Sequence, residues 1–248
     1  MVSKADSIHE VGLLEHAVRN VLNRTAPRRF AVLDPIKVVI ENYPEGQAKE
    51  MAVANNPEDT SAGTRMVSFG RELWIERDDF MEEPPPKFFR LSPGREVRLR
   101  SAYFVTCTQV VKDANGAVVE LRCTYDPETR GGNSPDGRKP KATLHWVSAA
   151  DAVPAEVRLY DHLFARPDPG ADGDLFADLN PASETVLAGC FVEPALAEAA
   201  TGETVQFERL GYFTPDADSA PGRLVFNRTL TLKDSWAKVQ AQGGGNAG

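Results

Sequence analysis

Residues 87–111 have the sequence KFFRLSPGREVRLRSAYFVTCTQVV. Side chains of an extended strand alternate between its two faces. Arg98 and Arg100 should therefore project from one face of this strand, while Val97 and Leu99 point the other way. The sequence thus predicts a strand with one apolar face and one strongly basic face.

The same stretch mixes cations with aromatic rings, namely Arg90, Arg98 and Arg100 with Phe88, Phe89, Tyr103 and Phe104. Guanidinium groups bind phosphates and base edges, and flat rings stack on unstacked bases, so the mixture is typical of a surface that holds a single-stranded nucleic acid. A solvated edge strand whose arginines only keep the sheet soluble has the same pattern. On the pattern alone, this second interpretation is the more frequent one.

The charge of the whole chain limits what such a surface could bind. The 248 residues carry a formal net charge of −8, which argues against a protein coated with positive charge. Residues 87–112 nevertheless contain six Lys and Arg and one acidic residue, Glu96. A nucleic-acid site would be a local basic patch on an acidic body, and such a patch favours selective binding.

No catalytic or metal-binding motif is apparent. The three cysteines have no CxxC spacing and are interpreted as buried, reduced thiols, which favours a cytoplasmic location. There is no signal peptide, membrane-spanning apolar run, phosphate-binding loop or HExxH motif. The acidic pairs Asp78/Asp79 and Glu82/Glu83 are interpreted as loop surface, and His145 as a hydrogen-bonded structural residue. The residues alone therefore indicate a binding module and not an enzyme active site.

One helix and many short strands are expected. Ser7 and Glu10 form a capping box at the start of a helix over residues 7–22, and Pro27 should end that region. The turn Asp113–Gly116 predicts a hairpin. The expected strands are 30–33, 36–41, 66–69, 72–77, 95–111, 118–125, 141–147, 157–164, 184–190, 204–213 and 224–232. Many short strands separated by turns are typical of sandwiches or barrels, and this length predicts two of them.

Eight motifs in order along the chain resemble the C-terminal anticodon-binding region of bacterial-type glutaminyl-tRNA synthetases, a class I family. They are APR (26–28) with VLDPIKV (32–38) and IENY (40–43), LWIER (73–77), GREVRLR (94–100), CTYD (123–126), LHWVSA (144–149), EVRLYD (156–161), FERLGYF (207–213) and VFNR (225–228). The resemblance extends to about residue 237 and favours the nucleic-acid interpretation of the arginine strand.

This resemblance implies a mainly β fold with two β-barrels, one inserted in the other, and a short N-terminal helical segment. The expected division is a helical remnant over 1–27, a proximal barrel over 28–86 and 166–240, a distal barrel over 87–165, and a flexible tail over 241–248. In the family, the barrels hold the anticodon loop with its three bases splayed into separate pockets.

The resemblance also implies roles for residues of the arginine stretch. Arg100 would read the first anticodon base, with Arg98 on a nearby phosphate. Arg90 would read the third base, a guanine, whose O6 and N7 match an arginine fork. Phe89 stands where family members can carry a lysine, so the third-base pocket would rely on Arg90.

Residues distant from that stretch complete the expected site. Arg28, Gln206 and Arg209 would surround the second anticodon base, a uridine. Asn23 and Asn55 would contact the non-Watson–Crick pairs that extend the anticodon stem. The second-base pocket would thus draw on both ends of the chain.

The nucleotide-binding catalytic domain of the family has no counterpart here, since neither a HIGH-like nor a KMSKS-like motif occurs. The chain alone should be inactive and hold no cofactor or metal, because ATP and Mg would belong to the missing catalytic domain. Its expected partners are glutamine tRNA and the catalytic half of the same polypeptide, with no membrane and a monomeric state. Two alternatives remain: a protein-interaction scaffold without RNA binding, and the equivalent domain of a glutamyl-tRNA synthetase.

Overall fold

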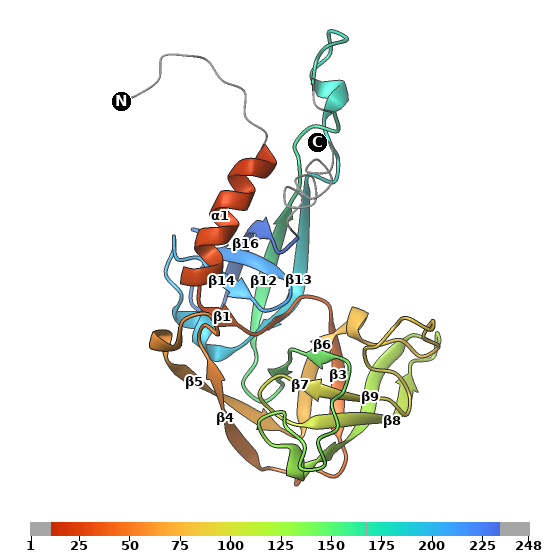
Figure 1. The fold of residues 1–248 in the computed structure, drawn as a ribbon. Coiled ribbons are helices and arrows are strands. Elements are labelled where there is room, and N and C mark those ends of the chain that lie inside the picture. The colour runs from red at the N-terminus through yellow and green to blue at the C-terminus, as the bar shows by residue number, and fades with distance from the viewer. Residues whose placement is uncertain (1–10, 167, 234–248) are drawn as a thin grey trace, which may run out of the picture.

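The computed structural model describes residues 11–166 and 168–233. These residues form a mainly β protein with one nearly closed barrel-like sheet, one half-barrel and a single α-helix among them (Figure 1). The predicted fold class is confirmed. The predicted capping box at Ser7 and Glu10 and the predicted C-terminal tail lie outside the described residues.

Two seven-stranded sheets make up most of the molecule. The first has the order β1-β14-β15-β16-β12-β13-β2. Its strands are β1 (Arg28–Arg29), β2 (Ala31–Val32), β12 (Val153–Tyr160), β13 (Glu184–Val192), β14 (Val205–Phe207), β15 (Gly211–Pro215) and β16 (Leu224–Thr231). The second has the order β10-β7-β8-β9-β3-β6-β11. Its strands are β3 (Pro35–Ile40), β6 (Glu72–Glu76), β7 (Glu96–Leu99), β8 (Phe104–Lys112), β9 (Val118–Asp126), β10 (Thr143–Leu144) and β11 (Val147–Ser148).

The remaining elements join and cover these sheets. A separate hairpin pairs β4 (Ala48–Ala54) with β5 (Thr64–Gly70). The α-helix is α1 (Val11–Thr25), and short 3-10 helices are η1 (Thr60–Ala62), η2 (Arg77–Asp79), η3 (Pro127–Thr129), η4 (Phe176–Asp178) and η5 (Pro194–Glu198). No helix among the described residues is both long and apolar enough to cross a membrane.

The second sheet is inserted into the first. The chain starts the first sheet with β1 and β2, builds the whole second sheet, and returns to the first with β12. The sheets divide the chain at other places than the predicted boundaries. Strands β3 and β6 pair within the second sheet, although the proximal barrel was expected to contain them, and β12 pairs within the first. Alternation of side chains predicts a strand but not its partner, because the partner is decided by tertiary packing.

The long strand expected over residues 95–111 is interrupted. The chain turns back between β7 and β8, so that Arg98 pairs with Phe104. Ser101 allows this turn at φ 57°, in the left-handed region. The predicted alternation is confirmed in β7, where Val97 and Leu99 are buried.

The aromatic rings of this stretch divide into two pairs. Tyr103 and Phe104 are buried in the protein interior, so they cannot stack on bases, and that part of the sequence interpretation was wrong. Phe88 is half-buried, whereas Phe89 is exposed and lies 4.7 Å from the ammonium of Lys141, measured to the ring centre. Only the second pair remains accessible to a ligand.

Helix α1 ends at Thr25, three residues beyond the predicted end at residue 22 and two residues before Pro27, which was expected to stop it. Its apolar residues mostly face solvent: Val11, Leu14, Val18 and Val21 are exposed. Near its end, Leu22 packs on a small cluster of Ala26, Tyr212 and Leu230. The helix is therefore attached to the first sheet through its last turn (Figure 1).

The hairpin predicted at Asp113–Gly116 joins β8 to β9 and is confirmed. The Asp113 carboxylate accepts hydrogen bonds from the N–H groups of Asn115 and Ala117, and Gly116 takes φ 84°. A carboxylate that binds backbone N–H groups two and four residues later stabilises a tight turn.

Candidate nucleic-acid interface

Arg100 follows β7 and lies where the two sheets approach each other. Its Nε donates to Glu208 Oε1 at 2.9 Å, and its Nη2 also binds that oxygen. The Arg100 side chain is 46% exposed, whereas that of Glu208 is 10% exposed. A nearly buried carboxylate of the first sheet thus holds a half-exposed guanidinium of the second.

Arg209 lies in the three-residue turn that joins β14 to β15, at φ 70°. Both of its terminal nitrogens bind the Asp79 carboxylate, at 2.6 and 2.7 Å, and Nη1 lies 3.2 Å from Nδ1 of His145. Burial opposes the charge of Arg209, but the carboxylates of Asp79, Glu76 and Glu208 outweigh it and keep its pKa above the ordinary value. The guanidinium is therefore permanently charged.

Arg90 also lies close to the Asp79 carboxylate. Its Nε lies 3.4 Å from Asp79 Oδ1, and its Nη1 donates to the backbone oxygen of Asp78 at 3.0 Å. The Arg90 side chain is 46% exposed, while the Asp79 side chain is 1% exposed. Asp79 consequently connects two of the predicted site residues.

Arg98 lies in β7, two residues before Arg100 and on the same face of the strand. Its guanidinium carbon is 5.3 Å from the centre of the Phe104 ring, a cation–π distance. Its Nε is buried and binds no acceptor among the described residues. The Arg98 fork is thus positioned by a ring and not by a carboxylate.

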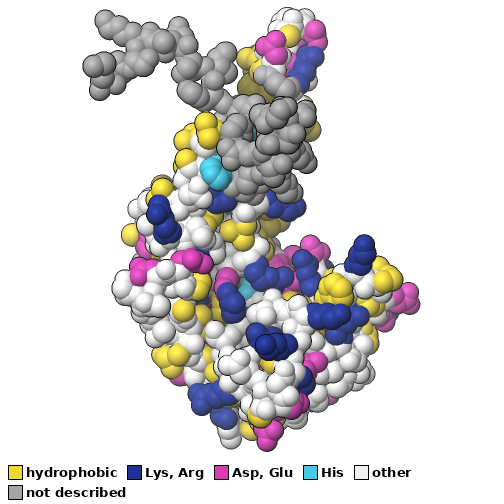
Figure 2. Space-filling view, viewed as in Figure 1, with side chains coloured by type: hydrophobic (Ala, Val, Ile, Leu, Met, Phe, Trp, Pro, Cys, Tyr) yellow, Lys and Arg dark blue, Asp and Glu magenta, His cyan; other side chains and the backbone are white. Residues whose placement is uncertain are grey.

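We call Arg90, Arg98, Arg100 and Arg209 the open arginine cluster. Two hollows adjoin at this cluster and share Arg100 and Glu208. One, of about 250 Å³, is also lined by Arg98 and Ser101, and the other, of about 300 Å³, by His145 and Arg209. Figure 2 shows Lys and Arg side chains gathered around the recess between the two sheets.

The other predicted site residues form a second group: Asn23, Arg28, Asn55 and Gln206. We call this group the closed arginine cluster, because its one arginine, Arg28, is buried. Arg28 is 5% exposed and donates to the backbone oxygens of Ala26 and Asn23 and to Asn23 Oδ1, all at 2.9 Å. Arg28 is the register partner of Gln206 across β1 and β14, and its N–H donates to Asn55 O. The segments of Arg28 and Gln206 lie together, as the resemblance implied, but the Arg28 guanidinium is buried and bonded within the protein.

Asn55 is tied to its surroundings by both ends of its amide. Its Oδ1 accepts from Nη1 of Arg29 at 3.0 Å, and its Nδ2 donates to Ala62 O at 2.9 Å. Asn23 remains exposed at the end of α1. Asn23 is thus the most exposed of this group, since Asn55 is half-buried and both Arg28 and Gln206 are buried.

Sequence reasoning missed the acidic residues of the site. Asp79 was interpreted as loop surface together with Asp78, but the short turn of η2 buries Asp79 and leaves Asp78 exposed. Glu208 was not predicted as a site residue, although it precedes Arg209 in the motif FERLGYF (207–213). The available signal was that Glu208 stands next to Arg209 in the sequence. It does not reveal that Glu208 pairs with Arg100 and that Arg209 pairs with Asp79. His145 is buried next to Arg209 and Glu76, as expected of a structural histidine.

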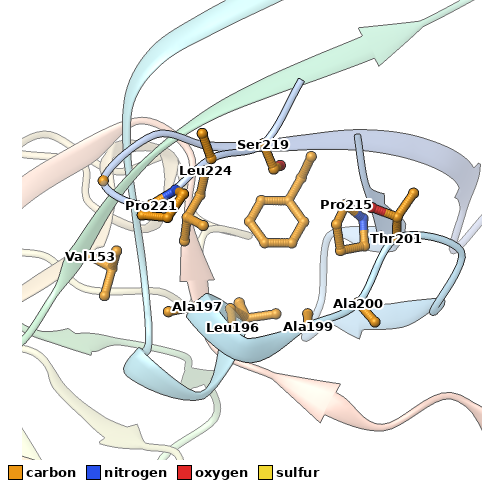
Figure 3. Close-up of a pocket in the computed structure, with 13 residues that line it drawn as sticks. Val153, Leu196, Ala197, Ala199, Ala200, Thr201, Pro215, Ser219, Pro221 and Leu224 are labelled. Atoms are coloured by element: carbon orange, nitrogen blue, oxygen red, sulfur yellow. The ribbon is translucent and has the colours of Figure 1, made fainter. Parts of the chain in front are cut away.

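Other features of the structure offer no comparable grouping. Within residues 11–166 and 168–233, no three His, Cys, Asp or Glu side chains are placed to hold a metal ion. A hollow of about 520 Å³ lies in the first sheet, where Val153, Leu196, Pro215 and Leu224 point into it (Figure 3). None of the predicted site residues lines this hollow, whose walls are mostly apolar.

Comparison with protein families agrees with this geometry. Residues 26–126 match the family model described as tRNA synthetases class I (E and Q), anti-codon binding domain, and residues 143–216 match a second model of the same description. The chain belongs to this family. The matched segments contain all of the predicted site residues except Asn23.

Individual relatives extend the match to nearly the full chain. It is 65% identical over 242 residues to the glutamine–tRNA ligase of Nitrobacter winogradskyi, which covers 98% of this chain and 43% of the relative. It is 62% identical to that of Bradyrhizobium diazoefficiens, with the same coverage, and 55% identical over 245 residues to that of Rhodopirellula baltica, covering 98% and 41%. The chain thus spans less than half the length of the curated relatives it matches.

Proposed function

We propose that this anticodon-binding region is the tRNA-recognition part of a glutamine–tRNA ligase and that it binds the anticodon loop of glutamine tRNA. The observation that carries the proposal is the open arginine cluster on a chain of net charge −8. Three of its guanidiniums, those of Arg98, Arg100 and Arg209, line two adjoining hollows, and the fourth, Arg90, shares the Asp79 carboxylate with Arg209. Such a local basic surface favours one anionic ligand over general adhesion to polyanions. The family description and the names of the relatives support the same ligand.

The open arginine cluster would contact the loop directly. Arg100 would read the first base where the two hollows meet, and Arg98 would bind a neighbouring phosphate. Arg209 would contact the second base and Arg90 the third, a guanine. Nη1 of Arg100 and Nη2 of Arg90 bind no acceptor among the described residues, so each fork keeps a donor for a base edge.

The closed arginine cluster would support this surface. Arg28 and Gln206 lie side by side on β1 and β14, and Gln206 comes just before Glu208 and Arg209 in the sequence. We propose that they hold the second-base pocket in place. Asn23 and Asn55, next to them, would contact the anticodon stem through neutral amide groups.

The activity of the whole ligase would depend on the part of the relatives that this chain does not match. ATP and Mg would bind there, and this chain would need no cofactor or metal of its own. The three cysteines of the chain are all free and buried, which suits the reducing cytoplasm where tRNA charging takes place. We expect the chain to act as a monomer in contact with tRNA and the catalytic part.

The proposal is tested by fluorescence anisotropy with three RNA stem-loops that differ only in the anticodon: glutamine, glutamate and a scrambled sequence. The glutamine stem-loop should bind most tightly, and its affinity should fall as salt rises from about 50 to about 200 mM, because phosphate contacts release counterions. Each base-specific contact should contribute about 1–3 kcal/mol of discrimination against the wrong base.

The outcomes separate the alternatives. A protein-interaction scaffold would bind none of the RNAs in a salt-dependent way, which would refute the proposal. Preference for the glutamate stem-loop would indicate the glutamyl-specific alternative. The relatives named above favour glutamine.

A further inference from the structure

We infer that Asp79 is a positioning residue that couples two base pockets, so that the second and third anticodon bases are recognised as one unit. The inference rests on the proposed function, in which Arg209 contacts the second base and Arg90 the third. Nothing in the sequence pattern singled out Asp79 for this role.

One carboxylate holds both guanidiniums. Asp79 receives two hydrogen bonds from Arg209, at 2.6 and 2.7 Å, and its Oδ1 lies 3.4 Å from Nε of Arg90. Its side chain is almost fully buried, whereas both arginines reach solvent. A buried carboxylate cannot swing away into water, so its position fixes the positions of both forks.

The backbone of Asp79 also binds the segment that carries Arg90. Its carbonyl oxygen accepts from the N–H of Leu91 at 3.0 Å, and the adjacent Phe80 forms a bridge with Leu91. Arg90 also donates to the backbone oxygen of Asp78. The third-base arginine is thus attached to η2 by its side chain and by the backbone next to it.

The second-base arginine depends on Asp79 for a different reason. Arg209 takes φ 70°, a conformation that costs a non-glycine residue about 1 kcal/mol or more and persists where the surroundings hold it. The paired hydrogen bonds to Asp79 are the strongest contacts of its side chain. Without them, Arg209 would keep its charge but lose its direction.

Sharing one carboxylate makes the two arginines interdependent. When RNA draws one guanidinium toward a base, Asp79 can bind the other more closely, or it can shift slightly within its buried site toward the first and weaken its contact with the second. In both cases, the energy of contact at one base depends on the occupancy of the other pocket. Groups in one hydrogen-bonded network typically show coupling of this kind in double-mutant cycles.

A plain structural role makes a different prediction. Asp79 follows β6 of the second sheet, and Arg209 follows β14 of the first, so their ion pair also connects the sheets. If that connection were its only effect, loss of Asp79 would lower thermal stability and leave base selectivity unchanged. The two roles are therefore distinguished by selectivity and not by stability.

The test uses Asp79→Asn, which keeps the shape of the side chain and removes its charge. Glu82→Gln is the matched control, since Glu82 is a nearby carboxylate whose partner Lys112 belongs to no base pocket. Affinities are measured for the glutamine stem-loop and for stem-loops swapped at the first, second or third base. Asp79→Asn should lower discrimination at the second and third bases together, each by about tenfold, and leave the first base unchanged.

A second variant covers the case in which Asp79→Asn folds poorly. Arg209→Lys keeps a positive charge on Asp79 but loses the two-point contact. If Asp79 couples the pockets, this change should weaken discrimination at the third base, which Arg209 does not contact. Unchanged third-base discrimination in both variants, or a loss confined to one base, would overturn the inference.

A measurement without RNA separates this inference from the proposed function. Phenylglyoxal reacts with accessible, unpaired arginines, and peptide mapping locates the modified residues. Both Arg90 and Arg209 should react several-fold faster in Asp79→Asn than in the wild-type protein, with Glu82→Gln as control. Equal reaction rates in the variant and the wild type would overturn the shared contact, even if RNA binding is confirmed. If the wild-type protein instead bound all three stem-loops with equal affinity, the proposed function alone would be refuted.

Discussion

The open and closed arginine clusters lie next to each other but place their guanidiniums in opposite settings. In the open arginine cluster, Arg100 and Arg90 are half-exposed, and the carboxylates beneath them are nearly buried. In the closed arginine cluster, Arg28 is almost fully buried, and its acceptors are two backbone carbonyls and an amide oxygen. The same residue type therefore serves two purposes within one predicted site.

The difference shows which arginines are ready to bind a ligand. A carboxylate that contacts one edge of a guanidinium fixes its direction and leaves the other edge for a second acceptor. The Arg28 guanidinium already donates to three oxygens of the protein, and drawing it to an RNA base would break those hydrogen bonds. We therefore expect the two groups to differ most clearly when stability and binding are measured separately.

The largest effect is expected for Arg28→Met. This substitution would leave Ala26 O, Asn23 O and Asn23 Oδ1 without their donor, and unpaired groups in and near the interior should lower the free energy of unfolding by about 2–4 kcal/mol. The matched control is Arg100→Met, which removes a half-exposed guanidinium from the nearly buried Glu208 carboxylate and should lower the free energy of unfolding by about 1 kcal/mol or less. Urea denaturation of both variants measures the contrast, and equal losses would show that the two clusters do not differ in this way.

Arg100→Ala should have the opposite profile. Loss of its fork should weaken binding of the glutamine stem-loop by about 1–3 kcal/mol and relax selectivity at the first base. Its free energy of unfolding should change by less than about 1 kcal/mol, because the side chain is half-exposed. Anisotropy titrations with cognate and first-base-swapped RNAs give the first quantity. If the variant binds both RNAs as the wild type does, Arg100 has been given the wrong role.

The open arginine cluster shows which features of the site can be predicted from the local sequence pattern. Burial of Val97 and Leu99 follows from their alternation with charged residues, and that alternation was enough to place Arg98 and Arg100 on one face. The partners of these arginines could not be predicted in the same way. Glu208 lies 108 residues after Arg100, so only the packing of the two sheets brings them together.

The acidic pair Asp78/Asp79 shows a second limit. Adjacent carboxylates in a loop usually both face water, yet a single turn of 3-10 helix directs them to opposite sides. Nothing in the residues themselves indicates which one will be buried. The resemblance to a known family predicted the inserted sheet, but the sheet in which β3 and β6 pair was decided by contacts distant in sequence.

The smallest effect is expected for Glu208→Gln, which tests whether the carboxylates of the open arginine cluster matter for selectivity. The amide can still contact Arg100 but no longer attracts it, so the fork would be less directed and more available to any phosphate. First-base discrimination should fall by up to about 1 kcal/mol, while affinity for swapped RNA stays equal or rises slightly. Glu82→Gln serves again as the control for loss of one negative charge. If Glu208→Gln sharpened discrimination instead, Glu208 would compete with the first base, and the open arginine cluster would have to release its carboxylate before binding.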